Sequence, residues 1–323
     1  MTRLADEIRR GDRRSLARAI TLVESTRADH RSEAVELLDA LMQDTGGSVR
    51  VGISGAPGAG KSTFIEALGM HLVVAGKRVA VLAVDPSSVR SGGSILGDKT
   101  RMESLSRSPD AFIRPSPSGG TLGGVARRTR EAMLLCEAAG FDVVLIETVG
   151  VGQSEVAVAG MVDLFLLLLA PGAGDELQGI KRGIVEIADL IVVNKADGEM
   201  AAAAARTVAD YAQALHVLRP RSAAWHPRVL GCSAITGEGI AGVWQAVEEH
   251  HRALEGAGVL TELRAGQARE WMWSEVTESL RAELGGDAEV AGLVERLERD
   301  VVSGAVSPAA AARRILEAFL GRG

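Results

Sequence analysis

One glycine-rich segment constrains the fold of this chain more than any other feature. Residues 55–62 read Gly-Ala-Pro-Gly-Ala-Gly-Lys-Ser, directly after the apolar run Val51–Ile53 and before a segment with helical character. A strand, a G-x-x-x-x-G-K-S loop and a helix are typical of a phosphate-binding loop, in which backbone N–H groups and the helix N-terminus face phosphate oxygens. This context favours phosphate binding over a plain glycine-rich turn, so we predict a P-loop fold.

The residue types of this loop have separate tasks. The glycines let the backbone wrap closely around phosphate, Lys61 can reach the outer phosphates, and the Ser62 hydroxyl can ligate magnesium. The predicted phosphate-binding residues are Gly55, Ala56, Pro57, Gly58, Ala59, Gly60, Lys61, Ser62 and Thr63.

Short apolar runs alternate with helix-like segments through the middle of the chain. The predicted strands are Val51–Ile53, Val79–Val84, Val143–Ile146, Leu164–Leu169, Leu190–Val193 and Arg228–Gly231. Strands rich in Val, Ile and Leu that alternate with helices indicate an α/β fold with a mostly parallel sheet and helices on both faces. We expect a helical N-terminal extension over residues 1–45, a P-loop domain over 46–256 and a helical C-terminal arm over 257–323.

A second motif, Asn194-Lys-Ala-Asp197, follows a predicted strand about 130 residues after Lys61. Ligands bind at the carboxyl ends of strands in open α/β sheets, and a carboxylate there can accept both N–H groups on one edge of guanine. Alone, the tetrapeptide could be a turn with a helix cap, but its place after a P-loop favours guanine binding. The predicted base-binding residues are Asn194, Lys195 and Asp197, with Ser233, Ala234 and Ile235 as candidates after the next strand.

Two carboxylates end predicted strands on the same sheet edge. Glu147, in Glu147-Thr-Val-Gly150, ends the third strand and could supply a magnesium ligand, while Gly150 could donate its N–H to the γ-phosphate. Asp85 ends the second strand and is a second candidate for the metal site. The alternatives are a strand-ending cap for Glu147 and an Asx turn before Pro86 for Asp85.

Two glycine-containing loops are less certain in function. Residues 92–101 contain Asp98, Lys99 and Arg101 and could order around a γ-phosphate, although a solvated connector explains them equally well. Residues 172–178 end with Asp175 and Gln178 at the spacing of a capping box, which is sufficient reason for their presence.

Composition excludes several other classes of protein. The formal net charge of −6 and the pI of about 5.6 give no long-range attraction to nucleic acid or anionic lipid. Cys136 and Cys232 have no metal-ligand spacing, and the charged N-terminus does not resemble a secretory signal. The longest apolar run, from Leu164 to Ala170, is too short to span a membrane. We therefore expect a cytoplasmic protein with neither nucleic-acid nor membrane partners.

Taken together, the motifs closely resemble the MeaB/MMAA/ArgK family of P-loop GTPases. The resemblance is carried by the P-loop and by Val-Asp-Pro-Ser-Ser, Gly-Gly-Ser-Ile-Leu-Gly-Asp-Lys-Thr-Arg-Met, Arg-Pro-Ser-Pro-Ser, Glu-Thr-Val-Gly-Val-Gly-Gln-Ser-Glu, Pro-Gly-Ala-Gly-Asp-Glu-Leu-Gln-Gly-Ile-Lys and Asn-Lys-Ala-Asp. It covers residues 1–260 densely, and the helical tail matches less clearly. Members of this family are GTPase chaperones of the adenosylcobalamin-dependent methylmalonyl-CoA mutase.

The resemblance implies further properties. It implies a homodimeric GTPase that binds GTP or GDP with Mg²⁺, related to the signal-recognition and nickel-insertion GTPases, with a C-terminal dimerisation arm. It implies that the nucleotide state gates adenosylcobalamin delivery to the mutase and protects that enzyme. The implied set for magnesium binding and water positioning is Ser62, Asp85, Asp98 and Glu147, with residues 172–181 as a switch that senses the mutase.

The implied reaction is in-line attack of water on the γ-phosphate of GTP. Lys61 would stabilise charge on the phosphate, and either Asp98 or Glu147 would orient the water. No residue is an obvious arginine finger, although Arg101 and Arg107 are candidates, so intrinsic turnover should be slow. Two alternatives remain: an ATP-dependent kinase linked to arginine and ornithine transport, as the family was once described, and a nucleotide-dependent binding switch with little turnover.

Overall fold

The structure is a computed structural model of the whole chain. It describes residues 2–84, 102–115, 122–148, 154–172, 182–215 and 220–321. Four predicted features therefore lie outside the described residues: Asp85, the loop with Asp98 and Arg101, Gly150, and residues 173–181.

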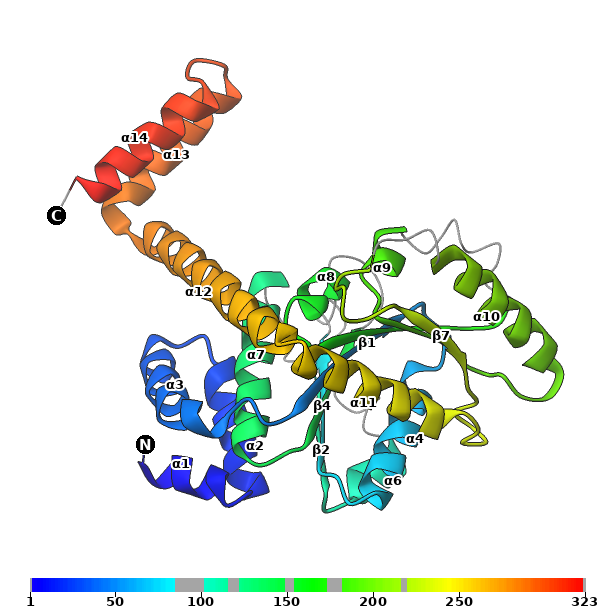
Figure 1. Cartoon of the computed structure of the whole chain (residues 1–323). Coiled ribbons are helices and arrows are strands. Elements are labelled where there is room, and N and C mark those ends of the chain that lie inside the picture. The colour runs from blue at the N-terminus through cyan, green and yellow to red at the C-terminus, as the bar shows by residue number, and fades with distance from the viewer. Residues whose placement is uncertain are drawn as a thin grey trace. The chain divides into compact units, whose positions relative to one another are not determined.

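A seven-stranded parallel sheet forms the centre of the P-loop region (Figure 1). The strand order is β3-β2-β4-β1-β5-β6-β7. The strands are β1 (Val49–Gly55), β2 (Val79–Val84), β3 (Ala111–Arg114), β4 (Val143–Thr148), β5 (Leu164–Leu169), β6 (Leu190–Val193) and β7 (Arg228–Gly231). All pairings are parallel, so every strand ends on the same edge, here called the carboxyl edge. The opposite edge is called the amino edge.

This sheet confirms the predicted fold class. Four of the predicted strands have the observed bounds, whereas β1 and β4 extend further at the carboxyl edge. The edge strand β3 was not predicted, because Ala-Phe-Ile-Arg is too short and too mixed to stand out as an apolar run.

Helices cover both faces of the sheet. They are α4 (Lys61–Val74), α6 (Glu103–Arg107), α7 (Leu122–Ala138), α8 (Ser154–Ala159), α9 (Arg182–Glu186), α10 (Ala201–Leu215) and α11 (Ile240–Gly256), with a 3-10 turn η3 at Gly198–Met200. Helices α4 and α11 pack on one face in a core that includes Phe64, Leu68, Val243 and Val247. Helices α7 and α8 contact the strands β2, β4 and β1. Burial of both faces explains why the central strands are apolar along their whole length.

The N-terminal extension is a group of three helices that packs beside α7 (Figure 1). The helices are α1 (Thr2–Arg9), α2 (Arg13–Glu24) and α3 (Ala28–Leu41), followed by the 3-10 turn η1 (Met42–Asp44). Gly11, with φ of 75°, allows the turn between α1 and α2, and Asp12 then caps α2 by accepting a 2.7 Å hydrogen bond from the Ser15 N–H. An ion pair between Arg31 and buried Glu131 ties α3 to α7.

A buried polar network lies at the amino edge. The Arg50 guanidinium binds both oxygens of Glu137, at 2.8 and 2.9 Å. Arg264 binds both oxygens of Asp163, at 2.8 and 2.7 Å, and also donates to the carbonyls of Gly46 and Ser48. Because Arg264 belongs to α12 (Val259–Gly286), this network fixes the beginning of that helix to the start of the sheet.

The chain divides into two compact units, residues 1–267 and 268–323. The second unit contains the rest of α12, α13 (Ala288–Val302) and α14 (Pro308–Leu320). Within it α13 packs against α14, which starts with a Ser307 cap and Pro308. Among the described residues, no helix has the combination of length and apolar character that crossing a bilayer requires.

Candidate functional site

The P-loop connects β1 to α4 at the carboxyl edge. Gly60 is the N-terminal cap of α4 and has φ of 86°, a left-handed conformation that favours glycine. Space gives a second reason for glycine here, because a Cβ at Gly60 would lie 2.7 Å from Nδ2 of Asn194. The phosphate loop and the predicted base-reading loop are thus in direct contact.

Lys61 folds back onto its own loop. Its ammonium group donates to the carbonyl oxygens of Gly55, at 2.7 Å, and Ala56, at 3.3 Å. Burial lowers the pKa of Lys61, while the nearby carboxylates of Glu147 and Glu155 act to raise it. These carboxylates favour the charged form that phosphate binding requires.

A carboxylate and a hydroxyl meet beside the P-loop. The Ser62 hydroxyl donates to Oε1 of Glu147 at 3.4 Å, and Glu147 is 7% exposed near the end of β4. Next to this pair, the Thr148 hydroxyl donates to the Ser54 hydroxyl at 2.8 Å, which links the ends of β4 and β1. Both Ser62 and Glu147 offer oxygen atoms, the ligands that Mg²⁺ prefers, so these two residues fit a metal site.

Asn194 joins three loops. Its Nδ2 donates to the carbonyl of Ala59 at 3.0 Å, and its Oδ1 accepts the N–H of Ala234 at 3.0 Å. The neighbouring Lys195 has φ of 57°, unusual for a residue other than glycine, and its ammonium group donates to the Gly58 carbonyl at 2.8 Å. The hydrogen bonds of the Asn194 and Lys195 side chains therefore hold the strained backbone of Lys195 in place.

Asp197 has an unused acceptor. Its Oδ1 atom is buried and has no hydrogen-bond partner in the described part of the chain. A buried carboxylate oxygen without a donor is costly, and a ligand with N–H groups would remove that cost. The arrangement fits the guanine edge predicted from the sequence.

The loop after β7 has one free backbone donor close to Asn194. The Ser233 N–H binds the carbonyl of Glu238 at 2.9 Å, and the Ala234 N–H is taken by Asn194. Within the described residues, the Ile235 N–H makes no hydrogen bond, and the Ile235 side chain is 79% exposed.

The structure thus brings together most of the predicted site residues at one edge. The P-loop contacts Asn194 and Lys195 directly. Glu147 contacts the P-loop through Ser62, and the loop of Ser233–Ile235 contacts Asn194 through the N–H of Ala234. Asp85, Asp98 and Gly150 lie outside the described residues, and Arg101 does as well. Arg107, a candidate arginine finger, pairs with Glu103 on the exposed helix α6.

Glu155 lies at this edge, and the sequence assigned it no role, although it ends the motif Glu-Thr-Val-Gly-Val-Gly-Gln-Ser-Glu. It lies in the first turn of α8, is 2% exposed, and acts on the charge of Lys61 together with Glu147. In the sequence it is one acidic residue at the start of an apolar helical segment, which is a common place for a surface residue. Only the fold shows that this position is buried.

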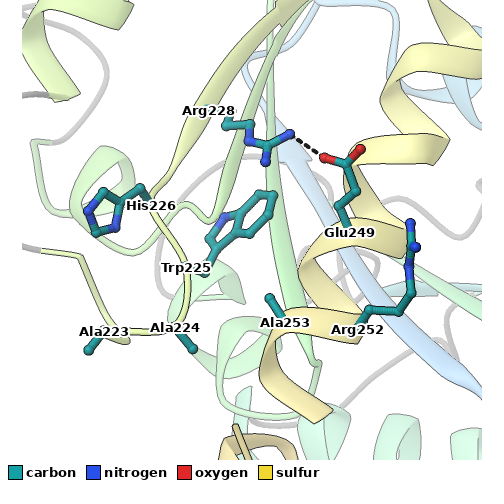
Figure 2. A pocket seen from close by; sticks show the side chains of 8 residues that line it. All are labelled: Ala223, Ala224, Trp225, His226, Arg228, Glu249, Arg252 and Ala253. Atoms are coloured by element: carbon teal, nitrogen blue, oxygen red, sulfur yellow. Dashed lines mark hydrogen bonds and ion pairs between the residues drawn. The ribbon is translucent and has the colours of Figure 1, made fainter. Parts of the chain in front are cut away.

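A second cleft, shown in Figure 2, lies near the start of β7 and so belongs to the amino edge. Its main cation is already paired: the Arg228 guanidinium lies 4.5 Å from the centroid of the Trp225 ring and binds Glu249 at 2.5 Å. This cleft is separate from the nucleotide edge.

Comparison with known proteins agrees with this geometry. The family model described as methylmalonyl Co-A mutase-associated GTPase MeaB matches residues 16–289. A Caulobacter vibrioides protein named as a GTPase is 60% identical over 309 residues, which cover 96% of this chain and 94% of the relative. The mouse protein named methylmalonic aciduria type A homolog, mitochondrial, is 50% identical, covering 99% of this chain and 80% of that protein.

A solved structure extends the agreement to the fold. The crystal structure described as LAO/AO transport system kinase has a TM-score of 0.78 and 41% identity, and the match covers 99% of this chain and 97% of that one. The match over most of the chain, the P-loop and the guanine-type loop lead to one conclusion: the chain belongs to the family of methylmalonyl-CoA mutase-associated GTPases and is a GTPase.

Proposed function

We propose that this GTPase is a chaperone of the adenosylcobalamin-dependent methylmalonyl-CoA mutase, which gates adenosylcobalamin delivery to the mutase and protects it. The observation that carries the proposal is the family match over residues 16–289, since it includes most of α2, all of α3 and the start of the C-terminal arm as well as the GTPase core. The name of the mouse relative supports the same role. In the present chain, Cys136 and Cys232 are free and buried, which suits a reducing compartment such as the cytoplasm.

We propose that the base is read by Asp197 and the loop after β7. The unpaired Oδ1 of Asp197 would accept guanine N–H groups, and the free N–H of Ile235 would donate to the guanine oxygen. Asn194 and Lys195 would act by holding the base loop against the P-loop. Adenine offers the opposite pattern of donors and acceptors at this edge, so ATP should bind poorly.

The proposed reaction is in-line attack of water on the γ-phosphate. Lys61 would exchange the carbonyls of Gly55 and Ala56 for phosphate oxygens, and Glu155 would help to keep its ammonium group charged. Ser62 and Glu147 would hold magnesium, with Asp85 and Asp98 completing the set. When bound, magnesium would neutralise charge on the phosphate oxygens. Either Asp98 or Glu147 would orient the attacking water.

Slow intrinsic turnover follows from the described arginines. Arg107 is engaged in an ion pair with Glu103, which lies four residues earlier on α6, so its guanidinium is not free for the γ-phosphate. The mutase should therefore accelerate hydrolysis by completing the site. Single-turnover GTP hydrolysis, measured with and without the cognate mutase, tests the proposal, and an unchanged rate would argue strongly against the chaperone role. A nucleotide switch with little turnover would bind GTP and the mutase but show no hydrolysis in either arm.

The solved structure is described as a transport system kinase, so an ATP-dependent kinase is the alternative to a GTPase. Competition of ATP and GTP against a labelled guanine nucleotide distinguishes the kinase from the GTPase, because a kinase that uses ATP would bind ATP at least as well as GTP. In the Asp197→Asn variant the preference for GTP should fall by about tenfold to a hundredfold, since hydrogen bonds to a charged group contribute about 1.5–3 kcal/mol. Equal preference in the variant and the wild type would rule out Asp197 as the base-reading residue.

We further propose that the arm of residues 257–323 forms a homodimer. Four apolar side chains on α12 are strongly exposed and recur at helical spacing: Met272 (52%), Trp273 (61%), Val276 (41%) and Leu280 (50%). A stripe of this kind is typical of a helix face that packs against another chain. Light scattering on Trp273→Glu, compared with the wild type, should show loss of the dimer.

A further inference from the structure

A basic cleft lies between α1 and α2, away from the nucleotide site. It has a volume of about 870 Å³ and is lined by Glu7, Arg10, Gly11, Asp12, Arg13, Arg14, Ser15 and Arg18. Arg13 donates to the carbonyl of Ser108 at 3.0 Å, in the segment that leads into β3. The cleft therefore belongs to the amino edge of the sheet.

The charge of this region contrasts with that of the chain. Residues 2–18 contain six arginines and three carboxylates, although the whole chain has a formal net charge of −6. Arg78 adds a further guanidinium close to the turn, since a Cβ at Gly11 would lie 3.0 Å from its Nη2. A local excess of positive charge on an acidic protein attracts anions to one place and repels them elsewhere.

The two carboxylates of the cleft are already occupied. Ser15 donates its hydroxyl to Glu7 and its backbone N–H to Asp12, both at 2.7 Å. Hydrogen bonds with Ser15 lower the pKa of both Glu7 and Asp12. Glu7 also accepts a 3.0 Å hydrogen bond from Arg3. Both carboxylates are thus fixed parts of the α1–α2 turn, and within the described residues neither forms a hydrogen bond or ion pair with the side chains of Arg10, Arg14 or Arg18.

Three of the arginines are available to a ligand. Arg10, Arg14 and Arg18 are exposed, and their guanidinium groups form no hydrogen bond or ion pair within the ranges that the structure describes. The cleft of Figure 2 is different, because Arg228 there is satisfied by Glu249 and by the ring of Trp225. Of the two clefts, the one between α1 and α2 offers the unpaired positive charge.

The spacing of these three arginines indicates the shape of the ligand. Arg14 and Arg18 lie one helical turn apart, about 6 Å along α2, and Arg10 lies in the turn that precedes this helix. A single phosphate is best held by donors that converge on one point, whereas a row of guanidinium groups matches a row of carboxylates. An acidic helix face or extended acidic segment would place carboxylates at this spacing.

We propose that the face formed by Arg10, Arg14 and Arg18 docks an acidic segment of a partner protein. This inference rests on the proposed function, which makes the client mutase the partner. Docking at the amino edge leaves the carboxyl edge open to another part of the same partner, which would accelerate hydrolysis there. The face supplies the orientation of the complex and the rate of encounter, as complementary charges do at protein interfaces.

The experiment compares two charge reversals of equal size. Arg14→Glu/Arg18→Glu removes the face, and Arg206→Glu/Arg252→Glu changes two exposed arginines on α10 and α11 as the matched control. Affinity for the cognate mutase is measured by titration calorimetry at about 0.05 M and about 0.5 M salt. We expect the first variant to bind about tenfold more weakly at low salt, the control to bind like the wild type, and the difference to vanish at high salt. Equal affinity of the two variants at low salt overturns the proposal.

A second arm keeps the result separate from the proposed function. If the wild type does not bind the mutase, the client assignment fails, and a short poly-L-glutamate peptide then tests the face alone. Weaker peptide binding by Arg14→Glu/Arg18→Glu than by the control supports the acidic-segment proposal. If this variant instead loses binding of inorganic triphosphate, with GDP saturating the P-loop, while peptide binding is unchanged, the face belongs to a phosphate ligand and the proposal is wrong. Intrinsic GTP hydrolysis should be the same in all variants, which confirms that they are folded.

Discussion

The polar groups at the two edges of the sheet differ in whether the chain itself provides their partners. At the carboxyl edge, within the part of the chain that the structure describes, Lys61 donates only to backbone carbonyls of its own loop, and Oδ1 of Asp197 is buried without a partner. At the amino edge, Arg264 and Asp163 satisfy one another in a bidentate ion pair. By our proposal a ligand completes the groups at the first edge, whereas the chain itself completes the groups at the second edge. Replacement should therefore cost activity at one edge and stability at the other.

The largest effect on stability is expected for Asp163→Ala. Asp163 has a side chain that is 1% exposed, and its removal leaves the partly buried guanidinium of Arg264 without its paired carboxylate. Breaking a buried pair in this way costs about 3–5 kcal/mol of unfolding free energy. Urea denaturation measures it, with Glu249→Ala as the control, because that variant breaks an exposed pair and should cost no more than about 1 kcal/mol. Similar losses in the two variants would contradict the distinction between the edges.

The converse effect is expected for Lys61→Ala. Loss of one group that stabilises charge in the transition state lowers kcat by about a hundredfold to a thousandfold. Stability should change little, because the lysine contributes two hydrogen bonds to carbonyls but its ammonium group is also partly desolvated. Single-turnover hydrolysis and thermal unfolding provide the two measurements. Retained hydrolysis would overturn the assignment of the phosphate loop, and a large fall in Tm would show that Lys61 is structural.

A smaller effect concerns His250, an exception to the comparison. It is 2% exposed on α11 and packs edge-on against Trp225. Its Nδ1 is buried and has no hydrogen-bond partner among the residues that the structure describes, although it lies away from the nucleotide edge. Burial lowers the pKa of His250 from 6.5 to about 4. Between pH 4 and pH 6.5 the ring is therefore neutral in the folded protein, whereas it binds a proton in the unfolded chain.

The free energy of unfolding should accordingly show no loss from His250 above about pH 6.5. It should fall as the pH decreases toward 4, and His250 should contribute about 1.4 kcal/mol per pH unit to this fall. Urea unfolding of His250→Phe across this range should show a shallower slope than the wild type. His226→Phe, which replaces an exposed histidine nearby, is the control and should keep the slope. An unchanged slope in His250→Phe would mean that the ring is already accessible to protons in the folded state.

The sheet could be predicted from the sequence because its signals are local. Runs such as Leu164–Leu169 and Leu190–Val193 are apolar throughout, and a strand buried on both faces requires this composition. The strand β3 carries no such signal, since two of its four residues are only partly buried. The amino-edge network was also beyond prediction, because Asp163 and Arg264 are 101 residues apart and only the fold brings them together.

The candidate site divides in the same way. The P-loop and Asn194–Asp197 were predicted from strand ends, and the structure places them in contact through Asn194 and the Ala59 carbonyl. The roles of these residues in hydrolysis stay predictions, as do those of Asp85, Asp98 and Gly150. Glu155 could not be predicted, because the electrostatic effect of a carboxylate on Lys61 depends on burial, and a single acidic residue in a helix does not indicate burial.

The contacts of Asn194 and Lys195 with the carbonyls of Ala59 and Gly58 have one more consequence. They fix the separation between the loops that we propose bind the base and the phosphates, so these loops should behave as one receptor with a set length. A nucleotide gains from both loops while losing its freedom of movement only once. Guanosine and pyrophosphate offered separately lose that advantage and should occupy the site far less well than the intact nucleotide.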